Sequence, residues 1–216
     1  MLNKLDHTLL TTTATSADFI KLCREGLKHN VASVCVPPSR VALCYKEVGG
    51  LVPICTVIGF PNGYNTTESK VFEAEQAIKH GASEIDMVIN PGHVRDKDFE
   101  LILEEIKSIR KVTLGCILKV IIETCQLTTS EKIALCEIVS KSGADYIKTS
   151  TGFNKGGATF GDIELIKKHV SPEVKIKAAG GIETPEDAEE FIKLGASRLG
   201  TSKLIKIIEG GEAKGY

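Results

Sequence analysis

Short apolar runs alternate with longer amphipathic segments along almost the whole chain. The clearest runs lie at 54–58 and 117–123 and are rich in β-branched residues. Such runs predict strands that are buried on both faces, as in a parallel sheet covered by helices. Between the runs, apolar residues recur at helical spacing, which predicts amphipathic helices.

These patterns place eight strands and seven helices along the chain. The strands are expected at 5–8, 32–36, 54–58, 84–89, 117–123, within 143–152, at 174–181 and at 197–202. The helices are expected at 15–29, 39–48, 66–80, 98–111, 128–142, 162–169 and 184–194. The first strand is short, and it is included because it extends the regular alternation of strand and helix.

A partial repeat supports this alternation. Segments 79–85, 141–147 and 193–199 each contain the end of a predicted helix, a glycine that terminates this helix, and the start of a strand. Eight strand and helix units in 216 residues predict an α/β fold, a single (β/α)8 TIM barrel. We expect residues 1–216 to form one catalytic domain with a short C-terminal tail. A doubly wound open sheet is the alternative.

Composition narrows the class of protein and its partners. The chain has 42% hydrophobic and 25% charged residues, as ordinary globular proteins do, and its net charge of -1 argues against nucleic-acid and membrane partners. Seven cysteines without a Cys-x-x-Cys pair predict reduced thiols in a cytoplasmic protein. Cys35 lies near a strand end and could react with an aldehyde, although a packed thiol is the simpler interpretation.

Lys148 stands where a short apolar run becomes a polar loop. Burying an ammonium group costs free energy unless the group is paired or loses its proton. Desolvation and a neighbouring cation both lower the pKa of a lysine, and a neutral amine can attack a carbonyl to form a Schiff base. Lys148 is therefore a candidate nucleophile. The alternative is that its head simply reaches solvent.

The expected barrel would bring further charges to Lys148. Active sites of such barrels lie at the C-terminal ends of the strands, where the sequence offers Asp6, Asp86, Lys119 and Lys177. Two neighbouring lysines lower each other's pKa, so one can remain neutral, and Asp86 could relay protons through a water. The alternative is an ion-pair network that only holds the barrel centre together.

Glycines after the last two strands predict a phosphate site. Gly180-Gly181 and Gly200-Thr201-Ser202-Lys203 occupy positions where barrel enzymes commonly bind phosphate through backbone N–H groups. Gly152 and the Gly156-Gly157 pair could add donors. Motifs for metal binding, nucleotide binding and serine hydrolases are missing from the sequence, so we expect neither a metal nor an organic cofactor.

The sequence resembles the deoxyribose-phosphate aldolase family. The segments that carry the resemblance span nearly the whole chain: Leu5-Asp6-His7-Thr8, Glu84-Ile85-Asp86-Met87-Val88, Leu118-Lys119-Val120-Ile121-Ile122-Glu123-Thr124, Tyr146-Ile147-Lys148-Thr149-Ser150-Thr151-Gly152 and Lys177-Ala178-Ala179-Gly180-Gly181. The resemblance implies a TIM-barrel class I aldolase without cofactors. It would reversibly cleave 2-deoxy-D-ribose 5-phosphate to D-glyceraldehyde 3-phosphate and acetaldehyde, and a homodimer is one option for its assembly.

The resemblance also implies roles for individual residues. Lys148 would form the Schiff base, Lys177 would tune it, and Asp86 would shuttle protons. The supporting residues would be Asp6, Lys119 and, on a C-terminal tail that can visit the site, Tyr216. The implied substrate and phosphate contacts are Thr151, Gly152, Gly180, Gly181, Gly200 and Ser202.

The chain departs from the family pattern near the expected phosphate site. Ala178-Ala179 replaces a pair that often contains proline or serine, Glu183 stands where a basic residue is expected, and Lys203 replaces serine or glycine. These changes bear on substrate affinity more than on the reaction, and Lys203 could supply a positive charge to the phosphate. Two other functions stay open: another Schiff-base barrel enzyme such as a transaldolase, and a catalytically silent sugar-phosphate sensor.

Overall fold

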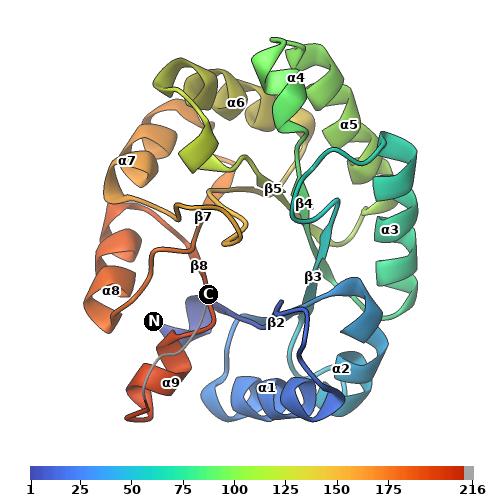
Figure 1. The fold of residues 1–216 in the computed structure, drawn as a ribbon, viewed down its shortest axis with the longest axis vertical. Helices are drawn as coiled ribbons and strands as arrows, with labels where there is room; N and C mark the ends of the chain where they lie inside the picture. Colours follow the sequence, from blue (N-terminus) through green and yellow to red (C-terminus); the bar gives the residue numbers. More distant parts are fainter. Residues whose placement is uncertain (212–216) are drawn as a thin grey trace.

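The computed structural model of the protein describes residues 1–211, and Tyr216 lies outside them. Within these residues, eight strands form a closed barrel in which every paired neighbour is parallel and β8 pairs with β1 (Figure 1). The strands are β1 (Leu5–Thr8), β2 (Ser33–Val36), β3 (Ile54–Ile58), β4 (Glu84–Val88), β5 (Ile117–Ile121), β6 (Tyr146–Lys148), β7 (Lys175–Ala179) and β8 (Arg198–Thr201). The predicted TIM barrel is confirmed, and the alternative of an open sheet is wrong.

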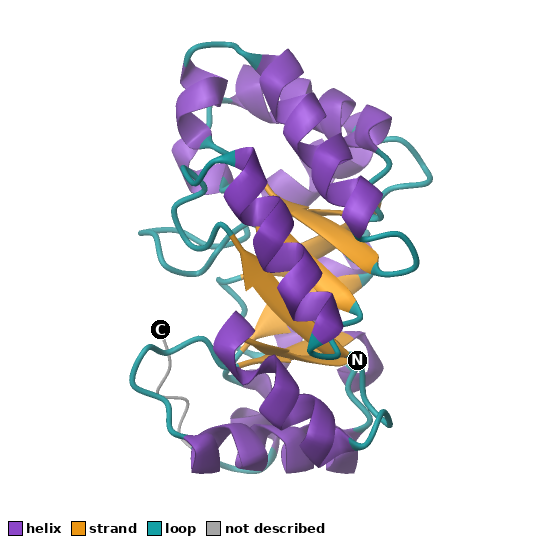
Figure 2. Cartoon of the chain, turned by 90° about the vertical axis from the view of Figure 1, so that its right-hand side faces the viewer, coloured by secondary structure: helices purple, strands orange, loops and turns teal. Residues whose placement is uncertain are grey.

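Helices surround the strands on the outside of the barrel (Figures 1 and 2). The longer ones are α1 (Ser16–His29), α2 (Val41–Val48), α3 (Thr67–Lys79), α5 (Phe99–Val112), α6 (Thr129–Ser142), α7 (Phe160–His169) and α8 (Pro185–Leu194). All seven match predicted helices. In the described part of the chain, no helix is long and apolar enough to cross a membrane.

Several short helices were missed. They are α4 (Pro91–Arg95), α9 (Leu204–Ile208), and the 3-10 helices η1 (Leu2–Lys4), η2 (Pro38–Arg40) and η3 (Thr124–Gln126). Their three to five residues are too few to show helical periodicity. The start of α4 also contains Pro91-Gly92, which in sequence reads as a turn.

Local capping fixes the starts of the longer helices. The Thr128 hydroxyl accepts from the backbone N–H of Glu131, and the Glu131 carboxylate accepts from the backbone N–H of Thr128 at 2.6 Å. The same reciprocal pattern joins Thr184 to Asp187 at the start of α8. Each of these two capping boxes satisfies two backbone N–H donors that the helix itself leaves unpaired. The predicted starts of α6 and α8 are therefore confirmed.

Alternation along the strands separates an apolar layer from a charged one. Ile85, Met87, Leu118 and Val120 belong to the hydrophobic core between the strands and the helices. Because successive side chains of a strand point to opposite faces, the residues between them face the barrel interior. In β4 and β5 these residues are charged, which is how a buried ionic cluster comes to lie inside an apolar fold.

The predicted positions of four charged residues need correction. Asp6, Asp86, Lys119 and Lys177 were expected at the C-terminal strand ends. Asp6 is the second of four residues in β1, and each of the other three is the third of five residues in its strand. Lys148 is the last residue of β6, as predicted, and pairs in register with Lys177. The charged residues therefore reach down into the barrel rather than forming a ring at its rim, because neighbouring strands of a tilted barrel are staggered.

Candidate active site

The interior of the barrel holds an ionic cluster of three carboxylates and four cations. All seven side chains come from residues that are buried, with exposures of 8% or less. They are contributed by six strands: Asp6, Glu84, Asp86, Lys119, Lys148, Lys177 and Arg198. The four predicted charges converge with Lys148, so the expectation that these residues meet in space is confirmed.

Asp86 lies at the centre of the cluster. Its Oδ2 atom accepts from Lys148 Nζ at 2.8 Å and from Lys177 Nζ at 2.7 Å. Its Oδ1 atom accepts from Lys119 Nζ at 2.8 Å. One carboxylate is thus shared by three lysines, which places the amine of Lys148 directly beside a base.

A deeper layer supports Asp86 from below. Arg198 donates to Asp6 at 2.5 Å and to Glu84 at 3.0 Å, and Lys119 lies 2.6 Å from Glu84. Lys177 also donates to Asp6. The sequence analysis missed Glu84 and Arg198 as site residues, although a charge inside a buried strand was the signal that singled out Asp86.

The electrostatics of the cluster reverse one expectation. Burial alone would lower the pKa of Lys177, but Asp6 and Asp86 outweigh burial and hold that pKa above its usual value. The same balance, with Asp86 as the strongest partner, holds the pKa of Lys119 well above its usual value. The prediction that neighbouring lysines would depress each other's pKa is therefore wrong for Lys177, because the carboxylates between the lysines dominate.

Asp86 itself remains ionised. Burial would raise its pKa, but Lys119, Lys148 and Lys177 together hold it well below its usual value. Four cations against three carboxylates leave one surplus positive charge in a buried space, which is unfavourable. Among the described residues, Asp86 is the one carboxylate partner of Lys148, which shares that oxygen with Lys177.

A pocket opens above the cluster. It is lined by Lys148, by residues from the loops after β6, β7 and β8, and by all six of the predicted substrate and phosphate contacts: Thr151, Gly152, Gly180, Gly181, Gly200 and Ser202. Gly180 and Gly181 have φ values of 68° and 67°, which favour glycine. The pocket therefore joins the candidate nucleophile to a rim that is largely backbone.

Comparisons with known proteins can now be set against this geometry. A family profile described as DeoC/LacD family aldolase matches residues 1–201. The chain belongs to this aldolase family. A protein named deoxyribose-phosphate aldolase from Clostridium botulinum type E3 is 51% identical over 216 residues, which are 100% of this chain and 98% of the relative. A protein of the same name from Streptococcus agalactiae serotype V is 56% identical over 97% of this chain and 94% of the relative.

Solved structures of other aldolases share the fold. One described as QR15, an aldolase, has a TM-score of 0.92 and 34% identity, and the match covers 97% of this chain and 96% of that one. The Aeropyrum pernix deoxyribose phosphate aldolase, described as tetrameric, has a TM-score of 0.85 and 29% identity over 93% of this chain and 86% of its own. The match thus extends over nearly the whole barrel.

Glu123 is a further residue that sequence reasoning did not place in the site of this aldolase. Its carboxylate accepts from the Thr151 hydroxyl and from Asn154 Nδ2, the latter at 2.9 Å. Its own backbone is left-handed, with φ at 57°. The Thr151 hydroxyl, predicted to contact substrate, is thus held by Glu123, which fixes the loop after β6.

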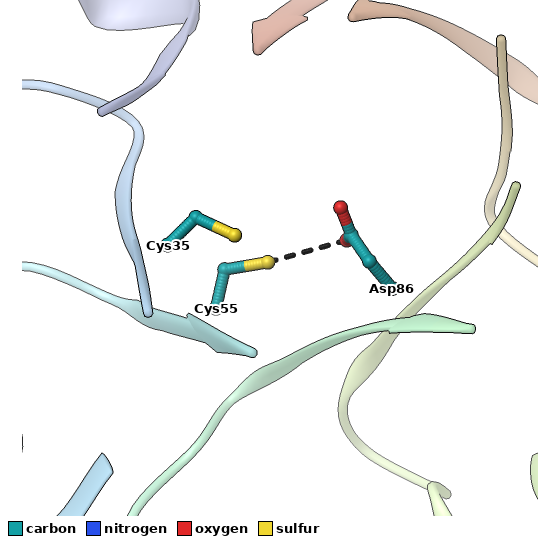
Figure 3. Close-up of side chains that lie close together, drawn as sticks. All are labelled: Cys35, Cys55 and Asp86. Carbon is teal, nitrogen blue, oxygen red and sulfur yellow. Dashed lines mark hydrogen bonds between the residues drawn. The ribbon is translucent and has the colours of Figure 1, made fainter. Parts of the chain in front are cut away.

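Two groups of residues have ligand atoms within 4.8 Å of one another and could in principle hold a metal. One is Cys35, Cys55 and Asp86, in which Cys55 Sγ donates to Asp86 Oδ1 at 3.2 Å (Figure 3). Lys119 Nζ lies 3.3 Å from Cys55 Sγ and also binds Asp86. A divalent cation would have to displace this ammonium group, so the donor set suits a lysine cluster better than a metal.

Cys35 is enclosed beside the cluster. It has no exposed surface and packs with Leu10, Cys55 and Val57. A hydrogen bond with Cys55 lowers the pKa of Cys35 despite this burial. The packing supports the simpler of the two interpretations, a core thiol.

The loop after β6 packs closely against the Gly180-Gly181 turn at the rim of the pocket. A Cβ added at Gly157 would lie 2.4 Å from Gly180 C and Gly181 N, whereas one at Gly161 would meet nothing within 4 Å. Gly157→Ala should lower the free energy of unfolding by about 1 to 3 kcal/mol, because the backbone must shift. Urea denaturation will measure this.

The matched control for that test is Gly161→Ala in the first turn of α7. This change should be neutral, or stabilising by up to about 1 kcal/mol, because alanine favours helix. Equal urea midpoints for the two variants would contradict the close packing at Gly157.

Proposed function

We propose that this protein is a deoxyribose-phosphate aldolase that works through a Schiff base on Lys148. The reaction is the reversible cleavage of 2-deoxy-D-ribose 5-phosphate to D-glyceraldehyde 3-phosphate and acetaldehyde. The observation that carries the proposal is the buried Lys148 amine, 2.8 Å from Asp86, at the floor of a glycine-rich pocket. The names of the full-length relatives support the choice of substrate.

Catalysis begins when the neutral amine of Lys148 attacks C1 of the open-chain sugar. The resulting carbinolamine loses water and becomes an iminium ion. Removal of the proton from the C3 hydroxyl then turns C3 into a carbonyl and breaks the C2–C3 bond. The electron pair of that bond moves onto C2 and neutralises the iminium, which gives an enamine and releases D-glyceraldehyde 3-phosphate. Protonation of C2 and hydrolysis of the new iminium release acetaldehyde and restore the amine.

Asp86 is assigned to proton movement in this scheme, and Lys177 is assigned to electrostatic support. The ionised carboxylate of Asp86 lies beside the reacting nitrogen and can accept a proton directly or through a water. Lys177 keeps its own proton because Asp6 and Asp86 hold its pKa high, so it acts as a fixed positive charge. Asp6 and Lys119 position Asp86, and Tyr216 is retained as a supporting residue from the family resemblance alone.

The phosphate end of the substrate is assigned to the rim of the pocket. Gly180, Gly181, Gly200 and Ser202 line this rim, where the Gly181 backbone N–H and the Ser202 hydroxyl are suited to an anion. The Gly180 N–H donates to Gly200 O at 3.3 Å, so Gly180 and Gly200 contribute mainly space for the phosphate. Thr151 and Gly152 complete this end of the pocket. No metal or organic cofactor is needed, because the lysine itself supplies the electron sink.

The proposal also covers the domain organisation, the location and the self-association of the protein. We assign residues 1–216 to one catalytic domain, and a cytoplasmic location is supported by the seven free cysteines. Self-association as a homodimer is part of the proposal. The tetramer described for the Aeropyrum pernix relative makes assembly a reasonable expectation.

Covalent trapping tests the central step. Borohydride reduction in the presence of 2-deoxyribose 5-phosphate or acetaldehyde should attach the ligand to Lys148, as shown by peptide mass mapping. In Lys148→Met the adduct should vanish and kcat should fall by about 10³-fold or more, the scale expected when a covalent nucleophile is lost. An adduct on another lysine would move the imine elsewhere. Binding without any adduct would favour the sensor.

The control for trapping is Lys132→Met. Lys132 is another partly buried, paired lysine, 2.6 Å from Asp162, but it lies on α6 outside the cluster. This variant should keep both the adduct and the activity. Product analysis with other phosphosugars will distinguish the proposed enzyme from a transaldolase.

The deeper layer of the cluster predicts a loss of stability. Arg198→Met leaves the buried carboxylates of Asp6 and Glu84 without a cation that they share. The free energy of unfolding should therefore fall by about 3 to 5 kcal/mol, the usual cost of removing one partner of a buried ion pair. A loss below about 1 kcal/mol would contradict this role of Arg198.

Arg110→Met is the control, because it removes a partly buried arginine from a more exposed ion pair. Arg110 binds Asp145 at 2.8 Å outside the barrel interior, and the Asp145 side chain is 44% exposed. Loss of this pair should lower the free energy of unfolding by less than loss of Arg198, since solvent screens exposed charges. Urea denaturation of both variants will measure the two losses.

A further inference from the structure

The rim of the pocket carries an ion pair between two residues of unusual type. Lys203 lines the pocket, and its Nζ lies 3.2 Å from Glu183 Oε1. The side chain of Lys203 is 20% exposed, whereas that of Glu183 is 70% exposed. Lys203 is therefore the more buried partner of this pair, and Glu183 is the more exposed one.

Lys203 holds a special position among the pocket residues. Of the described residues that line the pocket, Lys148 and Lys203 are the ones with positive charges. Lys148 belongs to the reacting end. Lys203 is thus the full positive charge available to a phosphate at the rim, where the other donors are neutral hydroxyl and backbone groups.

The backbone on both sides fixes this arrangement. The Glu183 N–H donates to Asp187 Oδ2 at 3.0 Å, which ties the residue to the capped start of α8. The Lys203 N–H donates to the Thr201 hydroxyl at 3.1 Å, which ties the other residue to the end of β8. These two backbone hydrogen bonds hold the turns that carry Glu183 and Lys203, and so they keep the two side chains close to each other.

We propose that Glu183 is a specificity-determining residue that restrains Lys203 and weakens the preference of the pocket for phosphate. This inference rests on the proposed aldolase function and deepens it. A substrate phosphate must compete with the carboxylate for Lys203 and is also repelled by it. An uncharged hydroxyl at the same place meets neither obstacle. The preference of the pocket for a phosphate ester over the corresponding unphosphorylated sugar is therefore smaller than it would be without Glu183.

The expected size of the effect follows from the exposure of the pair. Solvent screens exposed ion pairs, so removing Glu183 should change phosphate affinity by about three- to tenfold rather than by orders of magnitude. Added salt should reduce the difference, because the Debye length falls from about 10 Å at 0.1 M to about 3 Å at 1 M.

The test compares kcat/KM for 2-deoxyribose 5-phosphate and for 2-deoxyribose. In Glu183→Gln, the ratio of the two should rise by about three- to tenfold through a lower KM for the phosphate ester alone. In Lys203→Met, the ratio should fall. Adding Glu183→Gln to Lys203→Met should give a smaller rise than in the native background, because the cation that Glu183 restrains is gone.

Glu186→Gln is the matched control, since it removes the same charge from the exposed first turn of α8, three residues away. It should leave the ratio unchanged. An unchanged ratio in Glu183→Gln, or an equal change in both glutamate variants, would overturn the proposal.

A second measurement separates this proposal from the aldolase proposal. Calorimetric titration with inorganic phosphate needs no turnover, and binding should tighten by about three- to tenfold in Glu183→Gln and weaken in Lys203→Met. Unchanged phosphate binding, while Lys148 is still trapped by borohydride, would defeat the role of Glu183 alone. Tightened binding without a trapped lysine would defeat the aldolase mechanism and leave Glu183 as a determinant of phosphate affinity.

Discussion

The structure depends on one shared carboxylate. Asp86 binds three lysines inside a closed barrel, and none of the four side chains is more than 4% exposed. Burying any one of these charges alone would be strongly unfavourable, and removing one partner of a buried pair typically costs about 3 to 5 kcal/mol. The cluster is therefore stable only as a set, with Asp6, Glu84 and Arg198 completing it.

Barrel closure makes this set possible. A strand buried on both faces can point apolar residues outward to the helices and charged residues inward, and eight strands then bring their inward residues to a common centre. The pairing of β8 with β1 brings Asp6 and Arg198 together although they are far apart in sequence. In an open sheet, β1 and β8 would lie at separate positions and the deeper layer would lose this contact.

Much of this could be predicted from the sequence. The β-branched runs, the capping boxes and the glycine stops identified the barrel, and the polar turn after Lys148 indicated the candidate nucleophile. The depth of the charged residues was misjudged, although the predicted strands at 84–89 and 117–123 already place Asp86 and Lys119 inside their strands. Glu84 and Arg198 also carry charge in buried strands, but which charges meet across the barrel depends on strand stagger, which has no local signal. The sign of the Lys177 pKa shift was also wrong, since it depends on which carboxylate oxygens lie within hydrogen-bonding distance.

The two ends of the pocket differ in how freely their residues can change. At the reacting end, each charge is bound to several others, so a substitution disturbs the whole cluster and its proton balance. At the rim, the side chains of Glu183 and Lys203 stand in partly exposed turns where a change costs little stability. Under the proposed function, substrate preference can therefore change at the rim without a change at Lys148. This division follows directly from the fold, because the strands fix the first set of residues and the loops carry the second.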